Sequence, residues 1–248
     1  MVRNIKIKIA YDGTDYHGWQ TQLNRPTVQE TIEQAISIVM KQHVDLIGSG
    51  RTDSGVHAFG QVANFIADTN IPEGKIKIAL NANLPKDIRI IESEYASSEF
   101  NSRFDAHDKT YMYQIFNDKV WDPFYSRYSC FVPSSLDFEK MEKSVKPLIG
   151  THDFRSFMAA GSEVKTTVRT IYDTRLIKEG KLIKLYVKGN GFLYNMVRII
   201  AGTLIDIGKG IKTEQCIDEA INHTDRTLLG HTAQPQGLFL VNVSYESL

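Results

Sequence analysis

One stretch organises this chain, and it reads Gly48-Ser49-Gly50-Arg51-Thr52-Asp53-Ser54-Gly55-Val56-His57-Ala58. Its glycines allow the backbone to turn tightly and to come close to a ligand. An apolar run at 44–47 leads into the stretch, and alternation from Val62 to Ile66 leads away from it, so a strand–turn–strand arrangement is expected. Asp53 is therefore predicted at an exposed tip, beside the cation of Arg51.

The residues around Asp53 suit two interpretations. A carboxylate beside a guanidinium stays ionised, and an ionised carboxylate can act as a nucleophile or stabilise developing positive charge. The same residues are also typical of an Asp-Ser-Gly turn in which the aspartate bonds its own backbone. Taken alone, the stretch leaves both interpretations open.

Composition limits the class of protein. The chain has 248 residues, of which 42% are hydrophobic, and its 29 basic residues balance its 29 acidic ones. This is typical of a soluble globular protein, and no apolar run is long enough for a membrane. Two distant cysteines suggest neither a disulfide framework nor a zinc cluster. The alternation of Ile5, Ile7 and Ile9 with lysines predicts a strand and not a signal peptide, so a cytoplasmic protein is expected.

The first part of the chain, residues 1–105, predicts the order strand–helix–strand–strand–helix–strand. The first helix is expected to begin after Thr27, with Glu30 completing a capping box, because apolar residues recur at helical spacing up to Val39. A second helix is expected near residues 75–82, before a strand at 88–92. This is the split βαβ order of a ferredoxin-like unit.

The second part, residues 106–248, predicts a unit of similar order. Tyr111, Tyr113 and Ile115 share one face of a strand. Helices are expected at 138–148, around Met196 and from Thr213, and strands at 167–176, 182–188 and 238–243. The sequence thus predicts an α+β protein of two ferredoxin-like units, with mainly antiparallel sheets and helices packed on one side, and a duplication at the level of the fold.

Two further segments suggest a nucleic-acid partner. The loop at residues 11–20 is either a structural turn or, if its aromatic side chains are exposed, a surface for stacking on bases. Residues 155–198 hold nine basic side chains against three acidic ones. Such a local excess is typical of a surface that faces phosphates, or of a solvated face of a sheet.

The motifs resemble those of the tRNA pseudouridine synthase A family. The strongest is the stretch from Gly50 to Ala58. Seven further blocks stand in family order from about residue 9 to residue 240: Tyr11-Asp12-Gly13 with Gly18-Trp19-Gln20, Asn81-Ala82-Asn83-Leu84-Pro85, Arg103-Phe104-Asp105-Ala106, Lys109-Thr110-Tyr111-Met112-Tyr113, His152-Asp153-Phe154, Phe192 to Arg198, and Pro235-Gln236-Gly237-Leu238.

The resemblance implies a pseudouridine synthase fold and the isomerisation of selected uridines in the anticodon stem-loop of tRNA. It implies that Asp53 is the catalytic nucleophile. It also implies that Tyr111 packs on the flipped base, that Arg51 fills the space left by it, that Arg198 pairs with the carboxylate, and that Leu238 lines the pocket. The second unit is expected to complete the cleft. No cofactor or metal is implied, and the family's members are homodimers.

Two other functions are weighed against this one. A non-catalytic RNA-binding module would use aromatic strands to stack on bases, but it gives no reason for the Arg-Thr-Asp tip. A glycoside hydrolase would use Asp53 with a second carboxylate, for which Asp12, Asp15 and Asp87 are loosely placed candidates.

Overall fold

The computed structural model describes residues 1–161 and 164–245, which form two units. Unit 1 is Met1–His107 together with Phe239–Leu248, and unit 2 is Asp108–Leu238. The sequence-based division at residue 105 differs in where it places the C-terminal strand. That strand, β10 (Leu238–Ser244), pairs in parallel with the strand that follows the Asp53 loop, through Phe239 opposite His57.

Unit 1 is built on four strands of its own. They are β1 (Val2–Tyr11), β2 (Ile47–Gly48), β3 (His57–Asp68) and β4 (Ile88–Ala96), and the order β4-β1-β3 is antiparallel. Strand β2 pairs antiparallel with β3 at Asn64 and Ala63. The alternating isoleucines of β1 are fully buried, as the sequence predicts, because one face of the sheet is covered.

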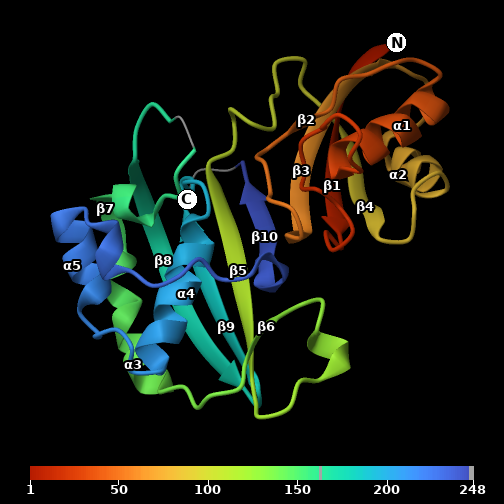
Figure 1. The fold of residues 1–248 in the computed structure, drawn as a ribbon. Coiled ribbons are helices and arrows are strands. Elements are labelled where there is room, and N and C mark those ends of the chain that lie inside the picture. The colour runs from red at the N-terminus through yellow and green to blue at the C-terminus, as the bar shows by residue number, and fades with distance from the viewer. Residues whose placement is uncertain (162–163, 246–248) are drawn as a thin grey trace. The chain divides into compact units, whose positions relative to one another are not determined.

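Helices α1 (Val28–Met40) and α2 (Glu73–Asn81) cover that face (Figure 1). The helical spacing of apolar residues in α1 is confirmed, since Val28, Ile32, Ala35 and Ile36 are buried. The predicted capping box is wrong. Thr27 stands at the N-cap, but its side chain makes no capping bond, and its buried hydroxyl has no hydrogen-bond partner within the described residues.

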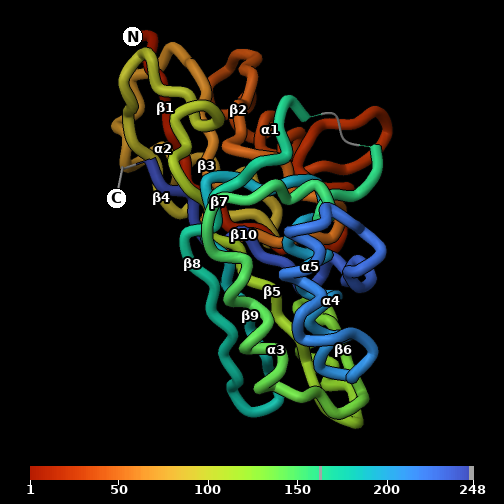
Figure 2. Tube along the Cα trace, turned by 90° about the vertical axis from the view of Figure 1, so that its left-hand side faces the viewer, coloured from red at the N-terminus to blue at the C-terminus, as the bar shows by residue number. Residues whose placement is uncertain are grey.

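Unit 2 has a sheet of the order β7-β8-β9-β5, antiparallel throughout. The strands are β5 (Asp108–Asn117), β7 (Gly150–Asp153), β8 (Val168–Glu179) and β9 (Leu182–Gly189), and a short β6 (Cys130–Val132) runs parallel to the end of β5. Helices α3 (Phe138–Ser144), α4 (Met196–Gly208) and α5 (Cys216–His223) lie together on one side of these strands (Figures 1 and 2). Helix α3 is shorter than predicted because Pro147 turns the chain into a 3-10 segment, Lys146–Leu148.

The two units repeat one pattern of connections. In unit 1, β1, α1, β2, β3 and α2 follow one another, and β3 lies between β1 and β2. In unit 2, β5, α3, β8, β9 and α4 take the same places, and β9 lies between β5 and β8. The predicted α+β class, with mainly antiparallel sheets and helices on one side, is confirmed. The repeat also supports a duplicated fold.

In the described part of the chain, no helix is long and apolar enough to cross a lipid bilayer. Both cysteines are free and buried, and burial raises the pKa of each thiol.

The core of unit 2 contains a close contact that only glycine permits. A Cβ atom at Gly202, inside α4, would lie 1.9 Å from the backbone oxygen of His231. Gly202→Ala should therefore lower the free energy of unfolding by about 1–3 kcal/mol, through overpacking. Gly74→Ala is the matched control, because a Cβ there meets nothing within 4 Å and alanine favours a helix. The free energy of unfolding of both variants is measured in urea, and equal values would contradict this close contact.

Candidate active site

Asp53 lies in the loop between β2 and β3, and its side chain is half-buried instead of fully exposed. The loop closes as a tight turn, in which the amide of Val56 donates to the carbonyl of Asp53 at 3.1 Å. Gly55 has a φ of 76°, a left-handed conformation that glycine adopts at no steric cost. The Asp-Ser-Gly sequence thus does form a turn, and the turn fixes the backbone that carries the carboxylate.

A second loop, residues 11–20, supports the first by hydrogen bonds. The amide of Trp19 donates to the carbonyl of Thr52 at 3.0 Å, and the amide of Gly55 donates to the carbonyl of Tyr16 at 3.3 Å. The hydroxyls of Tyr11 and Thr52 lie 2.8 Å apart, and both side chains are buried. The loop at residues 11–20 therefore forms hydrogen bonds with residues on both sides of Asp53.

Two glycines of the second loop let the backbones approach. A Cβ atom at Gly13 would lie 2.0 Å from the carbonyl oxygen of Val56, and one at Gly18 would lie 2.6 Å from that of Thr52. Gly18 also has a φ of 87°, which side chains rarely tolerate. The two loops are thus in direct backbone contact, which only glycine allows at these positions.

The aromatic side chains of the second loop are structural. Trp19 is 2% exposed and Tyr16 is 7% exposed, so neither is available to stack on a base. Trp19 packs against Tyr11, and burial together with a bond to Asp87 raises the pKa of the Tyr16 phenol. Of the two interpretations offered for this loop, the structural turn is the correct one.

His57 closes the loop on the β3 side. Its ring is 1% exposed and stacks on Phe239, with centroids 4.7 Å apart. Its Nδ1 accepts from the amide of Gly13 at 3.0 Å and lies 3.1 Å from a carboxylate oxygen of Asp12. Asp12 thereby faces an imidazole. Within residues 1–161 and 164–245, no group of three or more His, Cys, Asp or Glu side chains is placed to hold a metal ion.

Arg51 is exposed, and its side chain is oriented by Gln20, for which the sequence predicted no such role. Its Nε donates to the side-chain oxygen of Gln20 at 3.1 Å. Gln20 follows Trp19, whose amide is hydrogen-bonded to the carbonyl of Thr52. The contact between the two loops therefore supports both the guanidinium of Arg51 and the carboxylate of Asp53.

In unit 2, the connection between β9 and α4 contacts both Tyr111 and Arg198. The ring of Phe192 meets the half-buried ring of Tyr111 edge to face, with centroids 5.0 Å apart. Asn195, at a φ of 61°, accepts from a terminal nitrogen of Arg198 at 2.6 Å. The sequence named Tyr111 and Arg198, but it gave no sign of Phe192 as a partner.

The segment that leads to Leu238 is pinned to the same region of unit 2. Arg198 donates from Nε to the carbonyl of Ala233 at 2.9 Å, and the hydroxyl of Tyr113 donates to the carbonyl of Gln234 at 2.7 Å. Gly237 packs so closely that a Cβ would lie 2.8 Å from Tyr113. Burial raises the pKa of Tyr113, so its phenol remains a hydrogen-bond donor. Leu238 itself is 7% exposed.

The basic stretch at 155–198 is paired in part with neighbouring acids. Among the residues that the structure describes, five of its nine basic side chains form ion pairs with carboxylates, and three of those carboxylates lie outside the stretch: Arg155 with Asp153, Arg175 with Asp173, Lys181 with Asp118, Lys184 with Glu179, and Lys188 with Asp108. The local charge count therefore overstates the attraction that this stretch offers to phosphates.

Comparisons with known proteins agree across most of the chain. The family described as tRNA pseudouridine synthase matches residues 7–105 and 145–246. A protein named tRNA pseudouridine synthase A from Acetivibrio thermocellus is 47% identical over 244 residues, which is 98% of this chain and 100% of that protein. A protein of the same name from Caldicellulosiruptor bescii is 46% identical over 98% of this chain and 100% of its own length.

The contact of the two loops predicts the effect of Gly18→Ala. Its Cβ would strike the carbonyl of Thr52, so the loops should separate and expose Trp19. Gly161→Ala is the control, because Gly161 has the same φ of 87° and meets nothing within 4 Å. In a Trp121→Phe background, Trp19 is the remaining tryptophan of the two. We expect its fluorescence emission to move to longer wavelength in Gly18→Ala alone. An equal shift in both variants, or none, would contradict the contact.

Proposed function

The chain belongs to the tRNA pseudouridine synthase family, and on that basis we propose that it isomerises selected uridines in the anticodon stem-loop of tRNA to pseudouridine. The observation that carries the proposal is the full-length similarity to proteins of that name, which includes the stretch from Gly50 to Ala58. A base inside a folded stem must leave the stack before an enzyme can act on it. We place this activity in the cytoplasm.

The proposed nucleophile is the carboxylate of Asp53. In the reaction, the bond between N1 and C1′ breaks, the uracil turns, and a bond forms between C5 and C1′. C5 loses a proton and N1 gains one, so no electrons are lost or gained overall. A sugar that loses its base becomes cationic at C1′, which a carboxylate stabilises by attack or by charge. The reaction needs no cofactor or metal, because the departing uracil itself forms the new bond.

The other site residues have proposed roles in holding the substrate. Tyr111 packs on the flipped base, and its contact with Phe192 supports a fixed ring position. Arg51 fills the space that the base leaves, and its exposure and its bond to Gln20 suit that role. Arg198 pairs with the catalytic carboxylate, and Leu238 lines the pocket.

One assay distinguishes the proposed synthase from a glycoside hydrolase and from a non-catalytic RNA-binding module. The protein is incubated with unmodified tRNA, and the nucleosides are analysed for pseudouridine and for free uracil. A pseudouridine synthase forms pseudouridine, a glycoside hydrolase that uses Asp53 releases uracil, and an RNA-binding module yields neither. Pseudouridine without free uracil is the expected result.

Asp53→Asn tests the role of the carboxylate. The change removes the charge and keeps the shape, so turnover should vanish while affinity for tRNA changes by less than about tenfold. Asp45→Asn is the matched control, because that carboxylate is 97% exposed and should not affect turnover. Pseudouridine formation and tRNA binding are measured for both variants. Full activity of Asp53→Asn would rule out the mechanism.

We further propose that the protein is a homodimer whose two copies share one tRNA. A chain without net charge, in which over half of the basic side chains of residues 155–198 pair with carboxylates, offers phosphates little excess positive charge in a single copy. Isologous dimers are also the commonest soluble oligomers. Sedimentation should show a dimer. The logarithm of tRNA affinity should fall with that of salt at a slope steeper than about −3, as several phosphate contacts require. A fully active monomer, or binding that is indifferent to salt, would contradict the shared-substrate arrangement.

A further inference from the structure

Two exposed side chains of unit 1, Arg103 and Phe104, belong to a motif to which the proposed reaction assigns no role. Phe104 is 77% exposed, so most of its ring faces solvent. The guanidinium of Arg103, also exposed, lies 5.8 Å from the centroid of that ring. A single exposed phenylalanine is common and shows little by itself. This one is paired with a cation, and both side chains stand on a backbone that is firmly held.

A tight turn fixes the backbone that carries the pair. The side-chain oxygen of Asn101 accepts from the amide of Arg103 at 3.0 Å and from that of Phe104 at 3.2 Å. The amide of Asn101 donates to the carboxylate of Asp105 at 2.9 Å, and the amide of Asp105 donates to the carbonyl of Asn101 at 3.0 Å. Hydrogen bonds thus close the turn at both ends.

Buried polar groups attach this turn to the sheet through Ser102, which is fully buried. Its amide donates to the side-chain oxygen of Asn64 at 2.8 Å, and its hydroxyl donates to the carbonyl of Ile47. Its carbonyl accepts from the hydroxyl of Tyr245 at 2.8 Å. Moving the turn would leave these buried groups without partners, which costs free energy, so the pair is presented in one place.

The same attachment places the turn near the Asp53 loop. Ile47 is in β2, and the loop that carries Asp53 follows directly from this strand. The chain from Ile47 to Asp53 spans at most about 22 Å even when fully extended. A tRNA with one base at Asp53 extends beyond that distance, so other nucleotides of the same molecule reach the turn.

We propose that Arg103 and Phe104 bind tRNA outside the reacting nucleotide: an unpaired base stacks on the ring of Phe104, and Arg103 pairs with a phosphate beside it. This inference rests on the proposed function and extends its binding site. Every base has a π-face, and aromatic rings bind single-stranded nucleotides through it. A guanidinium lies well against a ring and also matches a phosphate with two parallel hydrogen bonds, so Arg103 suits both neighbours.

The size of the pair favours RNA over a second protein surface. A stable protein interface buries about 800 Å² on each partner, whereas a base needs a single ring. Phe104 is the one large apolar side chain that is exposed between residues 97 and 107. This segment thus offers one ring and one cation and no extended apolar patch.

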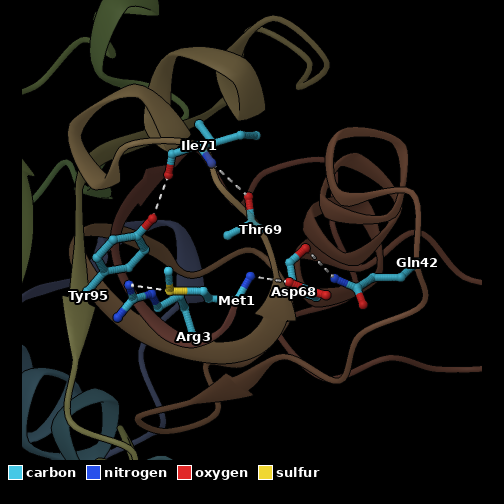
Figure 3. A network of polar contacts seen from close by, with 7 residues as sticks. All are labelled: Met1, Arg3, Gln42, Asp68, Thr69, Ile71 and Tyr95. Atoms are coloured by element: carbon cyan, nitrogen blue, oxygen red, sulfur yellow. Dashed lines mark hydrogen bonds and ion pairs between the residues drawn. The ribbon is translucent and has the colours of Figure 1, made fainter.

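Another arginine–aromatic pair of unit 1 supplies the matched control. The guanidinium of Arg3 lies 5.0 Å from the ring centroid of Tyr95 (Figure 3). That ring is half-buried, and its hydroxyl donates to the carbonyl of Ile71 at 2.6 Å. Arg3 also donates to the sulfur of Met1 at 3.3 Å. The control pair is therefore engaged within the protein, and its ring is less open to a base.

Arg103→Met, with Arg3→Met as the control, tests the phosphate contact. Both changes remove an exposed guanidinium from beside an aromatic ring. Affinity for unmodified tRNA should fall about tenfold in Arg103→Met, and the slope of its logarithm against that of salt should become shallower by about 0.7–0.9. Arg103→Lys keeps the charge and should restore the slope, and Arg3→Met should bind as the wild type does. Equal affinities and slopes for the two methionine variants would overturn the inference.

Phe104→Leu and Phe104→Tyr test the stacking. Leucine keeps an apolar side chain and loses the ring, whereas tyrosine keeps the ring. Affinity for tRNA should fall about tenfold in Phe104→Leu without a change in the salt slope, and should stay within about twofold of wild type in Phe104→Tyr. Because the side chain is exposed, both variants should melt at the wild-type temperature. Wild-type affinity in Phe104→Leu would overturn the inference.

Two further measurements on the same proteins separate the alternatives. Phe104→Leu should sediment as the wild type does, and a changed oligomeric state would assign the ring to a contact between two copies and overturn the inference. A wild type that binds tRNA and forms no pseudouridine would contradict the proposed function alone, since the affinities of the variants would still decide the role of Arg103 and Phe104. An active wild type with variants of full affinity would remove only that role, and a wild type that binds no tRNA would contradict both.

Discussion

Unit 1 depends on the contact between two backbones, that of the Asp53 loop and that of the loop at 11–20. At Gly13 and Gly18 the two chains come so close that a Cβ would strike a carbonyl oxygen of the other loop. Trp19, beside Gly18, must therefore be buried, and its amide bonds the Asp53 loop directly. The contact leaves little freedom to the four-residue turn that contains Asp53, so the carboxylate is placed before any substrate binds. Such preorganisation is what electrostatic catalysis requires.

Beside this contact, several of the buried side chains are polar. The side chains of Gln61, Ser49, Thr52 and Tyr11 are all buried. Gln61 forms hydrogen bonds with Ser49 and Gly50, and the hydroxyl of Tyr11 forms one with that of Thr52. Hydrogen bonds between buried polar groups are directional, so they fix the loop's position more narrowly than apolar packing does. The apolar residues of β1 and α1 stabilise the unit as a whole. Its polar residues determine where the loop lies.

The sequence predicted the features that repeat along it and missed those that join distant residues. Alternation in β1 and helical spacing in α1 were sufficient for those elements, and the proposal for Asp53 still rests on its motif. The sequence predicted no role for Gln61, because a polar residue in a strand is normally expected to face solvent. Its buried position follows only from the loop that packs beside it. A count of charges along the chain is incomplete for a similar reason, because Asp118, in the segment after β5, forms an ion pair with Lys181. Thr27 is a residue type that commonly caps helices, yet its buried hydroxyl finds no hydrogen-bond partner among the described residues.

Amide hydrogen exchange across residues 49–57, in the free protein and with unmodified tRNA, tests the central claim most directly. The account predicts that the amides of Ser49, Gly55 and Val56, which donate to Val62, Tyr16 and Asp53, are already protected in the free protein. Binding of tRNA should then change their protection little. Amides that exchange freely without tRNA and become protected only when it binds would show that the substrate orders the loop, and would contradict a preformed site.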